Sequence, residues 1–216
     1  MITKRIKEIR DSINKDVELV AVSKTKSNKE ILEAYNAGQK VFGENKIQEM
    51  TKKYEELPKD IKWHMVGHVQ SNKIKYMAPY VDLVHGIDSL KSLKILNKEA
   101  KKNDRVIRCL LQLKISDEFT KFGLSKEEIE SILNSINILD LMNINIAGIM
   151  TIGSFTENMN VVVKEFDKTK KIFDSLKTAF PNLKILSMGM SNDYKIAINH
   201  GSNMIRVGSL IFGKRV

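Results

Sequence analysis

Cysteine and long apolar runs are both scarce in this chain of 216 residues. The single cysteine, Cys109, excludes a disulfide within the chain, and its place in the apolar run 106–113 favours a buried strand thiol over a nucleophile. No apolar run approaches the roughly 20 residues that cross a bilayer. Residues 1–6 predict an amphipathic helix and lack the apolar core of a secretory leader. We therefore expect a cytoplasmic protein with no membrane partner.

Arginine and aromatic residues are also few, although the chain is basic. The formal net charge is +10 at pH 7, but 30 basic residues are lysine and 6 are arginine, and aromatic residues make up 6%. Nucleic-acid interfaces use arginine to bind phosphates and read bases, and aromatic rings to stack on bases. The lysines are instead scattered in doublets, as at 52–53, 101–102 and 170–171. We expect no nucleic-acid partner, and a basic nucleic-acid-binding protein is the second alternative function.

Short apolar strands alternate with helical segments along the whole chain, and no linker rich in glycine, serine or proline interrupts them. A single domain spanning residues 1–216 is therefore predicted. The predicted strands are 18–22, 40–42, 62–66, 83–85, 106–113, 145–150, 184–187 and 204–207. The predicted helices are 29–37, 46–56, 89–101, 126–135 and 161–180, with an extra helix at 2–13. Ser125 and Glu128 form a capping-box pattern, and Ser71 is expected to cap the segment 72–77.

Eight strand–helix units of about 27 residues fit a (β/α)8 TIM barrel at the short end of its size range. A doubly wound open sheet is the alternative, because closure cannot be read from periodicity. The even spacing favours the barrel, as does the placement of polar motifs just after successive strands, where barrel active sites are assembled.

Lys24 follows the first predicted strand directly. A lysine that leaves an apolar strand enters a partly desolvated pocket, where its pKa falls and the neutral amine can attack a carbonyl carbon. Lys24 is thus a candidate for a Schiff base, although a surface lysine is the commoner outcome for this pattern alone. Lys26 either lowers the pKa of Lys24 further or lies in solvent. After the second strand, Glu44 is expected to orient a lysine, and Asn45 to contact a ring oxygen or cap a helix.

His64 and His68 have the four-residue spacing of a helical metal pair. Gly67 and the extended pattern before it argue against a shared helix face, so we assign no metal, and His64 is expected to be structural.

Two motifs near the end of the chain predict an anion site. In the segment 187–193, Ser191 adds a hydroxyl to the backbone N–H groups of a flexible turn, although a helix N-cap explains this serine equally well. In the segment 204–209, Arg206 lies within an apolar strand and needs a partner, which a ligand atom could supply. Together these motifs predict a phosphate site after strands seven and eight.

Six motifs occur in order along the chain: AVSKTK (21–26), FGEN (42–45), WHMVGHVQSNK (63–73), GIMTI (148–152), LSMGMSND (186–193) and GSNMIRVGS (201–209). Together they resemble the YggS/PROSC family of pyridoxal-phosphate-binding proteins over nearly the whole chain. The resemblance implies a fold type III barrel like the N-terminal domain of alanine racemase, with pyridoxal 5'-phosphate held on Lys24 as a Schiff base. It further implies these roles: Ser191, Gly208 and Ser209 hold the phosphate, Arg206 faces the pyridine nitrogen, and Asn45 lies near the ring.

Two positions depart from the family's usual residues. Ser209 replaces a threonine and keeps the hydroxyl, whereas Gly86 replaces a serine, which puts any role of that side chain in doubt. The charge of Arg206 should keep the pyridine nitrogen unprotonated, which weakens the ring as an electron sink.

The resemblance also implies a monomer that stores or delivers pyridoxal phosphate, with apo-enzymes as possible recipients and effects on amino-acid and keto-acid pools. Alanine racemase takes its second base, a tyrosine, from a separate domain of the partner subunit, and residues up to Val216 include no such domain. Robust catalysis is therefore not expected. The runner-up is an amino-acid racemase that uses Lys24 and an unidentified acid or base. The tyrosines to test are Tyr35, Tyr54, Tyr76, Tyr80 and Tyr194.

Overall fold

Eight parallel strands form a closed barrel in the computed structural model, which describes residues 1–115, 122–135 and 140–213. The strands are β1 (Glu18–Val22), β2 (Val41–Glu44), β3 (Lys62–Met65), β4 (Leu83–Ile87), β5 (Ile107–Gln112), β6 (Ile144–Met150), β7 (Ile185–Ser187) and β8 (Met204–Val207). The barrel closes where β8 pairs with β1, with Val207 opposite Ala21. This pairing confirms the predicted barrel and rules out the open sheet, whose two edge strands would be unpaired.

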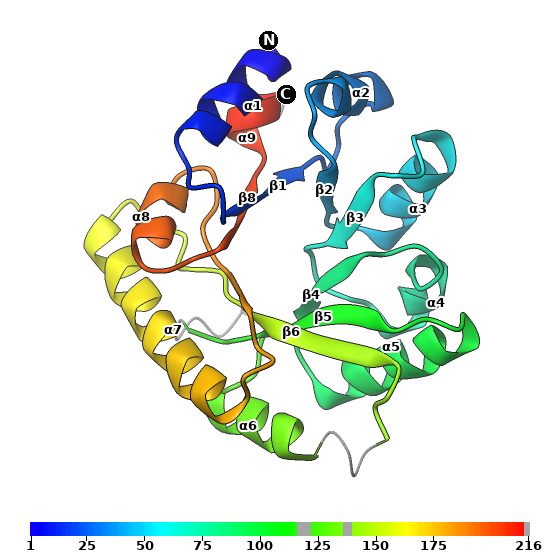
Figure 1. Ribbon diagram of the computed structural model, residues 1–216, viewed down its shortest axis with the longest axis vertical. Coiled ribbons are helices and arrows are strands. Elements are labelled where there is room, and N and C mark those ends of the chain that lie inside the picture. Colours follow the sequence, from blue (N-terminus) through cyan, green and yellow to red (C-terminus); the bar gives the residue numbers. More distant parts are fainter. Residues whose placement is uncertain (116–121, 136–139, 214–216) are drawn as a thin grey trace.

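Helices surround the barrel between successive strands (Figure 1). They are α1 (Ile2–Asp11), α2 (Asn28–Asn36), α3 (Ile47–Glu56), α4 (Ile74–Met77), α5 (Leu90–Lys102), α6 (Lys126–Ser135), α7 (Met159–Ala179), α8 (Tyr194–Asn199) and α9 (Ser209–Phe212). The predicted extra helix before the first strand is α1. It lies beside α9, the last helix, and Arg5 of α1 donates a hydrogen bond to the carbonyl of Ile211 in α9 over 3.3 Å.

The helix starts follow the capping rules in some places and not in others. At α6, Ser125 accepts from the N–H of Glu128, and the Glu128 carboxylate accepts from the N–H of Ser125, which confirms the predicted capping box. Ser71 does not cap a helix, because it is the first residue of the short 3-10 helix Ser71–Lys73 that precedes α4. The loop after Gly67 thus enters its helix through a tighter turn than the sequence pattern predicted.

Two apolar layers fill the structure. The larger lies between the barrel and the helices, and it takes the side chains of α1 that recur along one helix face, Ile2, Ile6 and Ile9. The smaller consists of inward-facing strand residues such as Val20 and Leu110. Both layers remove apolar surface from water, and this hydrophobic effect is the main contribution that stabilises such a fold.

The second strand is longer than its sequence pattern indicated. It continues through Gly43 and Glu44, which pair with His64 and Met65 of β3. Neither Gly43 nor Glu44 is apolar, so the apolar pattern ends at Phe42 although the strand continues.

Cys109 is fully buried in β5, as predicted, and burial raises the pKa of its thiol to about 12. A thiol with so high a pKa is protonated at neutral pH and is a poor nucleophile. Across the described ranges, helices capable of crossing a membrane are absent, as are clusters of side chains that could hold a metal ion.

Candidate functional site

Polar side chains take the inward-facing positions at the carboxyl ends of several strands. Residues two apart on a strand point to the same face. Ile185 and Met204 belong to the apolar cluster inside the barrel, and two positions further on are Ser187 and Arg206, both buried. The interior therefore changes from apolar to polar toward the end where barrel enzymes assemble their sites.

The loops after β7 and β8 meet at a hydroxyl and a backbone N–H. The N–H of Gly208 donates a hydrogen bond to Ser191 Oγ over 3.3 Å, and the exposed Ser209 follows directly as the first residue of α9. A Cβ atom on Gly208 would lie 3.1 Å from the carbonyl oxygen of Val22, two residues before Lys24. Donors suited to phosphate oxygens are thus gathered beside the end of β1.

Ser191 is not the cap of the helix that follows it. The N-cap of α8 is Asp193, whose side chain makes no capping hydrogen bond. Asp193 Oδ1 instead accepts from the N–H of Met190 over 2.5 Å, and burial raises the pKa of this carboxyl. Gly189 makes this reversal possible, since its φ of +96° is rarely adopted by residues with a side chain. The turn leaves the Ser191 hydroxyl directed at Gly208.

Arg206 is held inside the barrel by uncharged oxygen atoms. Its Nη1 donates to the carbonyl and the hydroxyl of Ser187, over 3.0 and 2.7 Å, and its Nη2 donates to the carbonyl of Thr151 over 2.9 Å. Burial lowers the pKa of this guanidinium to about 10, and the charge of Asp193 acts in the opposite direction. Arg206 therefore stays charged at neutral pH and has a fixed orientation in the polar end of the barrel.

A chain of hydrogen bonds continues from Ser187 across the barrel. Ser187 Oγ lies 3.2 Å from His85 Nδ1, and His85 Nε2 lies 3.1 Å from His64 Nδ1. His64 Nε2 then meets Asp82 at 3.2 Å. Burial lowers the pKa of His85 well below its usual value, and the positive charge of Arg206 adds to this effect. The structural role expected for His64 is thus to connect a buried neutral histidine to a carboxylate.

Lys24 and Lys26 both follow the end of β1 and are both partly buried. Lys24 is half-buried two residues beyond the strand. Lys26 Nζ donates to the carbonyl of Phe212 over 3.2 Å and pairs with Glu30 at 3.4 Å. The expectation that Lys26 lies in solvent is wrong, because the end of α9 and the first turn of α2 provide it with acceptors.

Glu44 does orient a lysine, but the lysine is Lys53 of α3. Their Oε1 and Nζ atoms are 2.8 Å apart, and both side chains are buried. No sequence motif pointed to Lys53, although a signal existed. It follows Ile47 and Met50 at helical spacing on the buried face of α3, where a lysine is unusual.

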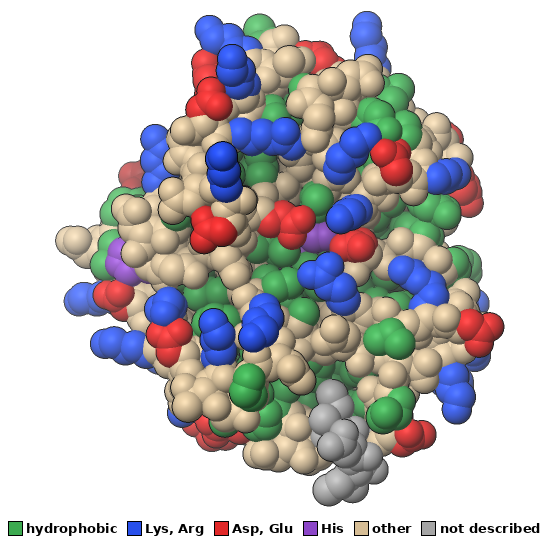
Figure 2. Space-filling model, viewed as in Figure 1, with side chains coloured by type: hydrophobic (Ala, Val, Ile, Leu, Met, Phe, Trp, Pro, Cys, Tyr) green, Lys and Arg blue, Asp and Glu red, His purple; other side chains and the backbone are tan. Residues whose placement is uncertain are grey.

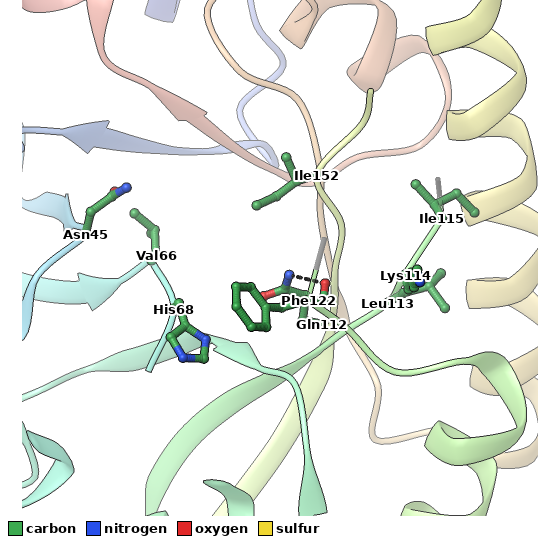
Figure 3. Close-up of a pocket in the computed structure, with 10 residues that line it drawn as sticks. Asn45, Val66, His68, Gln112, Leu113, Lys114, Ile115, Phe122 and Ile152 are labelled. Carbon is green, nitrogen blue, oxygen red and sulfur yellow. Dashed lines mark hydrogen bonds between the residues drawn. The ribbon is translucent and has the colours of Figure 1, made fainter. Parts of the chain in front are cut away.

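Asn45 does not cap α3, whose N-cap is Lys46. It lines a pocket of about 220 Å³ at the mouth of the barrel, together with residues that follow β3, β5 and β6. Figure 3 shows Asn45 and Val66 on one side of this pocket and Ile152 beside it. The rings of His68 and Phe122 stack at its edge with their centroids 4.4 Å apart. The pocket adjoins the polar end of the barrel and leaves Asn45 accessible to a ligand.

Two glycines let the strand ends approach closely around Asn45. A Cβ atom on Gly67 would lie 2.4 Å from the carbonyl oxygen of Asn45, and one on Gly86 would lie 2.5 Å from the carbonyl oxygen of Gly67. These distances are too short for any side chain without a backbone shift. The glycine at position 86 is therefore required by the packing of this chain.

The surface around the barrel mixes charges of both signs. Figure 2 shows lysine and arginine side chains interspersed with acidic ones on the face in view, without a continuous basic stripe. Ion pairs between lysine and acidic side chains also occur along the helices, as between Lys170 and Asp174 of α7 and between Lys126 and Glu130 of α6.

Comparison with known proteins places the chain in a family. Residues 1–216 match the model of the alanine racemase N-terminal domain. The chain belongs to this family. It is 38% identical to the pyridoxal phosphate homeostasis protein of Aquifex aeolicus, over 92% of this chain and 87% of that protein. It is 34% identical to the protein of the same name from Escherichia coli K12, over 99% of this chain and 97% of that one. The resemblance inferred from the six motifs is confirmed.

Solved structures give the same result for the fold. The structure of PipY from Synechococcus elongatus PCC7942 with PLP bound has a TM-score of 0.90 and 32% identity, covering 99% of this chain and all of that one (100%). An alanine racemase of Clostridium difficile 630 has a TM-score of 0.81 at 16% identity, and this chain spans 56% of its length. The second likeness shows the shared barrel only.

Proposed function

We propose that this chain binds pyridoxal 5'-phosphate through Lys24 and stores or delivers the cofactor within the cell. The observation that carries the proposal is the close packing at Gly208. Its N–H donates to Ser191 Oγ, and a Cβ atom on it would lie 3.1 Å from the carbonyl oxygen of Val22, so the loops after β7 and β8 lie beside the strand end that precedes Lys24. The names of its relatives and the PLP bound to PipY support the same cofactor.

The residues present fit such a ligand. In the proposed arrangement, Ser191, Gly208 and Ser209 bind the phosphate through hydroxyl and N–H groups, and Asn45 contacts the ring from the neighbouring pocket. Arg206, which is buried and charged at neutral pH, would face the pyridine nitrogen and leave it unprotonated, because a guanidinium donates hydrogen bonds and keeps its proton. When bound, the cofactor supplies an aldehyde that forms a Schiff base with an amine and a ring that withdraws electrons.

We do not propose robust catalysis. An unprotonated pyridine nitrogen makes the ring a weaker electron sink, so reactions that need a long-lived carbanion are disfavoured. A racemase would also need a second acid or base opposite Lys24. Three tyrosine hydroxyls bond elsewhere: Tyr35 to Asp60, Tyr80 to Thr51 and Tyr194 to Ser12.

The two remaining tyrosines are no better placed. Tyr54 stacks on Tyr80 with the ring centroids 4.0 Å apart, and Tyr76 is 48% exposed on α4. None of the described residues that line the pocket beside Asn45 is a tyrosine. An amino-acid racemase thus stays the alternative, and it predicts that one enantiomer of alanine or serine is converted to the other at enzyme-like rates by the wild type and not by Lys24→Ala.

The proposal also covers the partners of the protein. We propose a monomer, made of one domain over residues 1–216, that acts in the cytoplasm and transfers pyridoxal phosphate to apo-enzymes without binding nucleic acid. On the face that Figure 2 shows, charges of both signs are mixed, which supports the last point for that face. Sedimentation velocity would test the monomer, and salt-dependent retention on DNA or RNA would contradict the absence of nucleic-acid binding.

Borohydride reduction tests the proposed function directly. The purified protein mixed with pyridoxal phosphate should absorb visible light and lose that absorption on reduction, and peptide mass analysis should find the pyridoxyl group on Lys24. Lys26→Ala is the matched control, because it removes a neighbouring lysine that bonds to Phe212 and Glu30. Reduction that leaves Lys24 unmodified in the wild type would refute the proposal.

A further inference from the structure

Thr25, the residue after Lys24, has a strained backbone. Its φ is +65°, in the left-handed region. This conformation is unfavourable for an L-residue, and a β-branched side chain is especially disfavoured there. The other non-glycine residues with positive φ in the described ranges are Asp104 and Asp140, whose side-chain type tolerates it better. A strained residue persists only where its surroundings hold it, and such residues gather at functional sites.

Two side chains of α3 hold the backbone on both sides of Lys24. Glu49 Oε1 accepts a hydrogen bond from the N–H of Thr25 over 2.6 Å. Lys53 Nζ donates one to the carbonyl of Ser23 over 2.8 Å. The peptide groups before and after Lys24 are thus fixed by charged groups, and hydrogen bonds of this kind are stronger than neutral ones.

These two side chains belong to a cluster of three charged residues, Glu44, Glu49 and Lys53, which we call the Lys53 cluster. Lys53 Nζ lies 2.8 Å from Glu44 Oε1 and 2.7 Å from Glu49 Oε1. The side chains of Lys53 and Glu44 are 7% and 0% exposed, and that of Glu49 is 26% exposed. Ser23 Oγ also donates to Glu44 Oε1 over 2.6 Å. The cluster therefore links the ends of β1 and β2 to α3.

Stability alone does not account for the Lys53 cluster. Burying charged groups carries a desolvation cost that ion pairing often fails to offset, so apolar residues of similar volume would serve the core as well or better. Glu44 Oε2 is buried without a hydrogen-bond partner among the described residues. Burial raises the pKa of Glu44, although Lys53 acts in the opposite direction. The desolvation cost of the Lys53 cluster is explained if the cluster serves to position Lys24.

We propose that Glu49 and Lys53, supported by Glu44, are positioning residues that hold the turn at Lys24 so that its amine is directed toward the aldehyde of pyridoxal phosphate. This inference rests on the proposed function, since Lys24 must be the residue that binds the cofactor. Without the cluster, Thr25 relaxes to a negative φ and the direction of the Lys24 side chain changes with it. The cofactor is then bound less tightly and released faster.

Glu49→Ala is the first variant to make, because Lys53 keeps its pairing with the more deeply buried Glu44. Glu55→Ala is the matched control: it makes the same change on the same helix at an exposed residue. We expect Glu49→Ala to release pyridoxal phosphate about tenfold faster than Glu55→Ala, as the loss of a charge-assisted hydrogen bond implies. The release rate is measured by trapping the free cofactor with an apo-enzyme. Equal release rates in the two variants would refute the inference.

A second substitution distinguishes positioning from a general loss of stability. Glycine adopts positive φ as readily as negative φ, so Thr25→Gly removes the tendency of this residue to relax. In the Glu49→Ala background, Thr25→Gly should recover part of the lost retention, by several-fold in the release rate. A cluster that only stabilised the fold would give no recovery, because glycine also makes the unfolded chain more flexible. Absence of recovery would therefore contradict the positioning role.

Hydrogen exchange at the Thr25 amide tests the cluster without the cofactor. In the protein free of pyridoxal phosphate, the exchange of this amide should be about tenfold faster in Glu49→Ala than in Glu55→Ala. If Glu49→Ala does not fold, Glu49→Gln keeps the shape of the side chain and should show a smaller increase. If the wild type forms no adduct at Lys24, the proposed function fails, whereas unchanged exchange in either Glu49 variant overturns the cluster itself.

Discussion

Arg206 Nη1 and the hydroxyl of Ser187 are 2.7 Å apart, the shortest of the three hydrogen bonds that fix this guanidinium. A guanidinium only donates, so the serine oxygen accepts and its own proton is left for His85 Nδ1, at 3.2 Å. His85 must then carry its proton on Nε2, which faces His64. This arrangement requires a neutral His85, in agreement with the lowering of its pKa by burial.

The neutrality of His85 predicts how stability depends on pH. Because the folded-state pKa of His85 is depressed, the unfolded chain binds its proton first as the pH falls. The contribution of His85 to the free energy of unfolding is fully present above its unfolded-state pKa of about 6.5. As the pH falls from there toward the folded-state pKa, this contribution decreases by up to about 1.4 kcal/mol per pH unit. Urea unfolding at pH 7.5, 6.5 and 5.5 should show this loss in the wild type and a smaller one in His85→Gln. The inference fails if the two proteins have the same pH dependence.

The hydroxyl of Ser191 should contribute to cofactor affinity. Ser191→Ala removes an oxygen that lies 3.3 Å from the Gly208 nitrogen, at the proposed phosphate site. Loss of one hydrogen bond to a charged phosphate, worth about 1.5–3 kcal/mol, should weaken binding by roughly ten- to a hundredfold. Fluorescence titration with pyridoxal phosphate measures this change. Ser131→Ala, on the exposed face of α6, is the control, and a Ser191 variant with the control's affinity would place the phosphate elsewhere.

A serine at position 86 should destabilise this chain, even though the resembling family usually has one there. The Cβ atom would lie 2.5 Å from the carbonyl oxygen of Gly67, and that backbone is itself packed against Asn45. Accommodating the side chain requires a backbone shift that costs about 1–3 kcal/mol. Thermal unfolding of Gly86→Ser should show a lowered midpoint. Gly86→Ala should lower it too, since the Cβ atom makes the contact, and an unchanged midpoint in both variants would contradict the packing argument.

The elements of the barrel followed from local pattern with small errors at their ends. The strand at 18–22 and the helix at 126–135 were predicted with the bounds that the structure has, because apolar periodicity and caps are local signals. The second strand was predicted too short, since Gly43 and Glu44 extend it by pairing with β3 and not by apolar character. Pairing between strands distant in sequence leaves no mark on composition.

The roles of single polar residues were predicted less well. Lys26, Ser71 and Asn45 each had a local interpretation that the structure did not bear out, because their partners are set by the packing of other elements. Arg206 lies within an apolar strand and was correctly expected to need a partner. The sequence did not show that the oxygens that hold it come from β7 and from the loop after β6. A sequence can show that a buried charged group needs hydrogen-bond partners, but it does not show which atoms those partners are.

The sequence by itself determined the family, the places of the eight strands along the chain, and the positions of Lys24 after a strand and Arg206 within one, because these depend on periodicity and on motifs read along one chain. Only the tertiary structure decided that Gly208 contacts Val22, that Glu44 and Glu49 meet at Lys53, and that Thr25 is strained beside Lys24. These contacts depend on the register with which the barrel closes. Each joins residues that only the folded chain brings within a few ångströms.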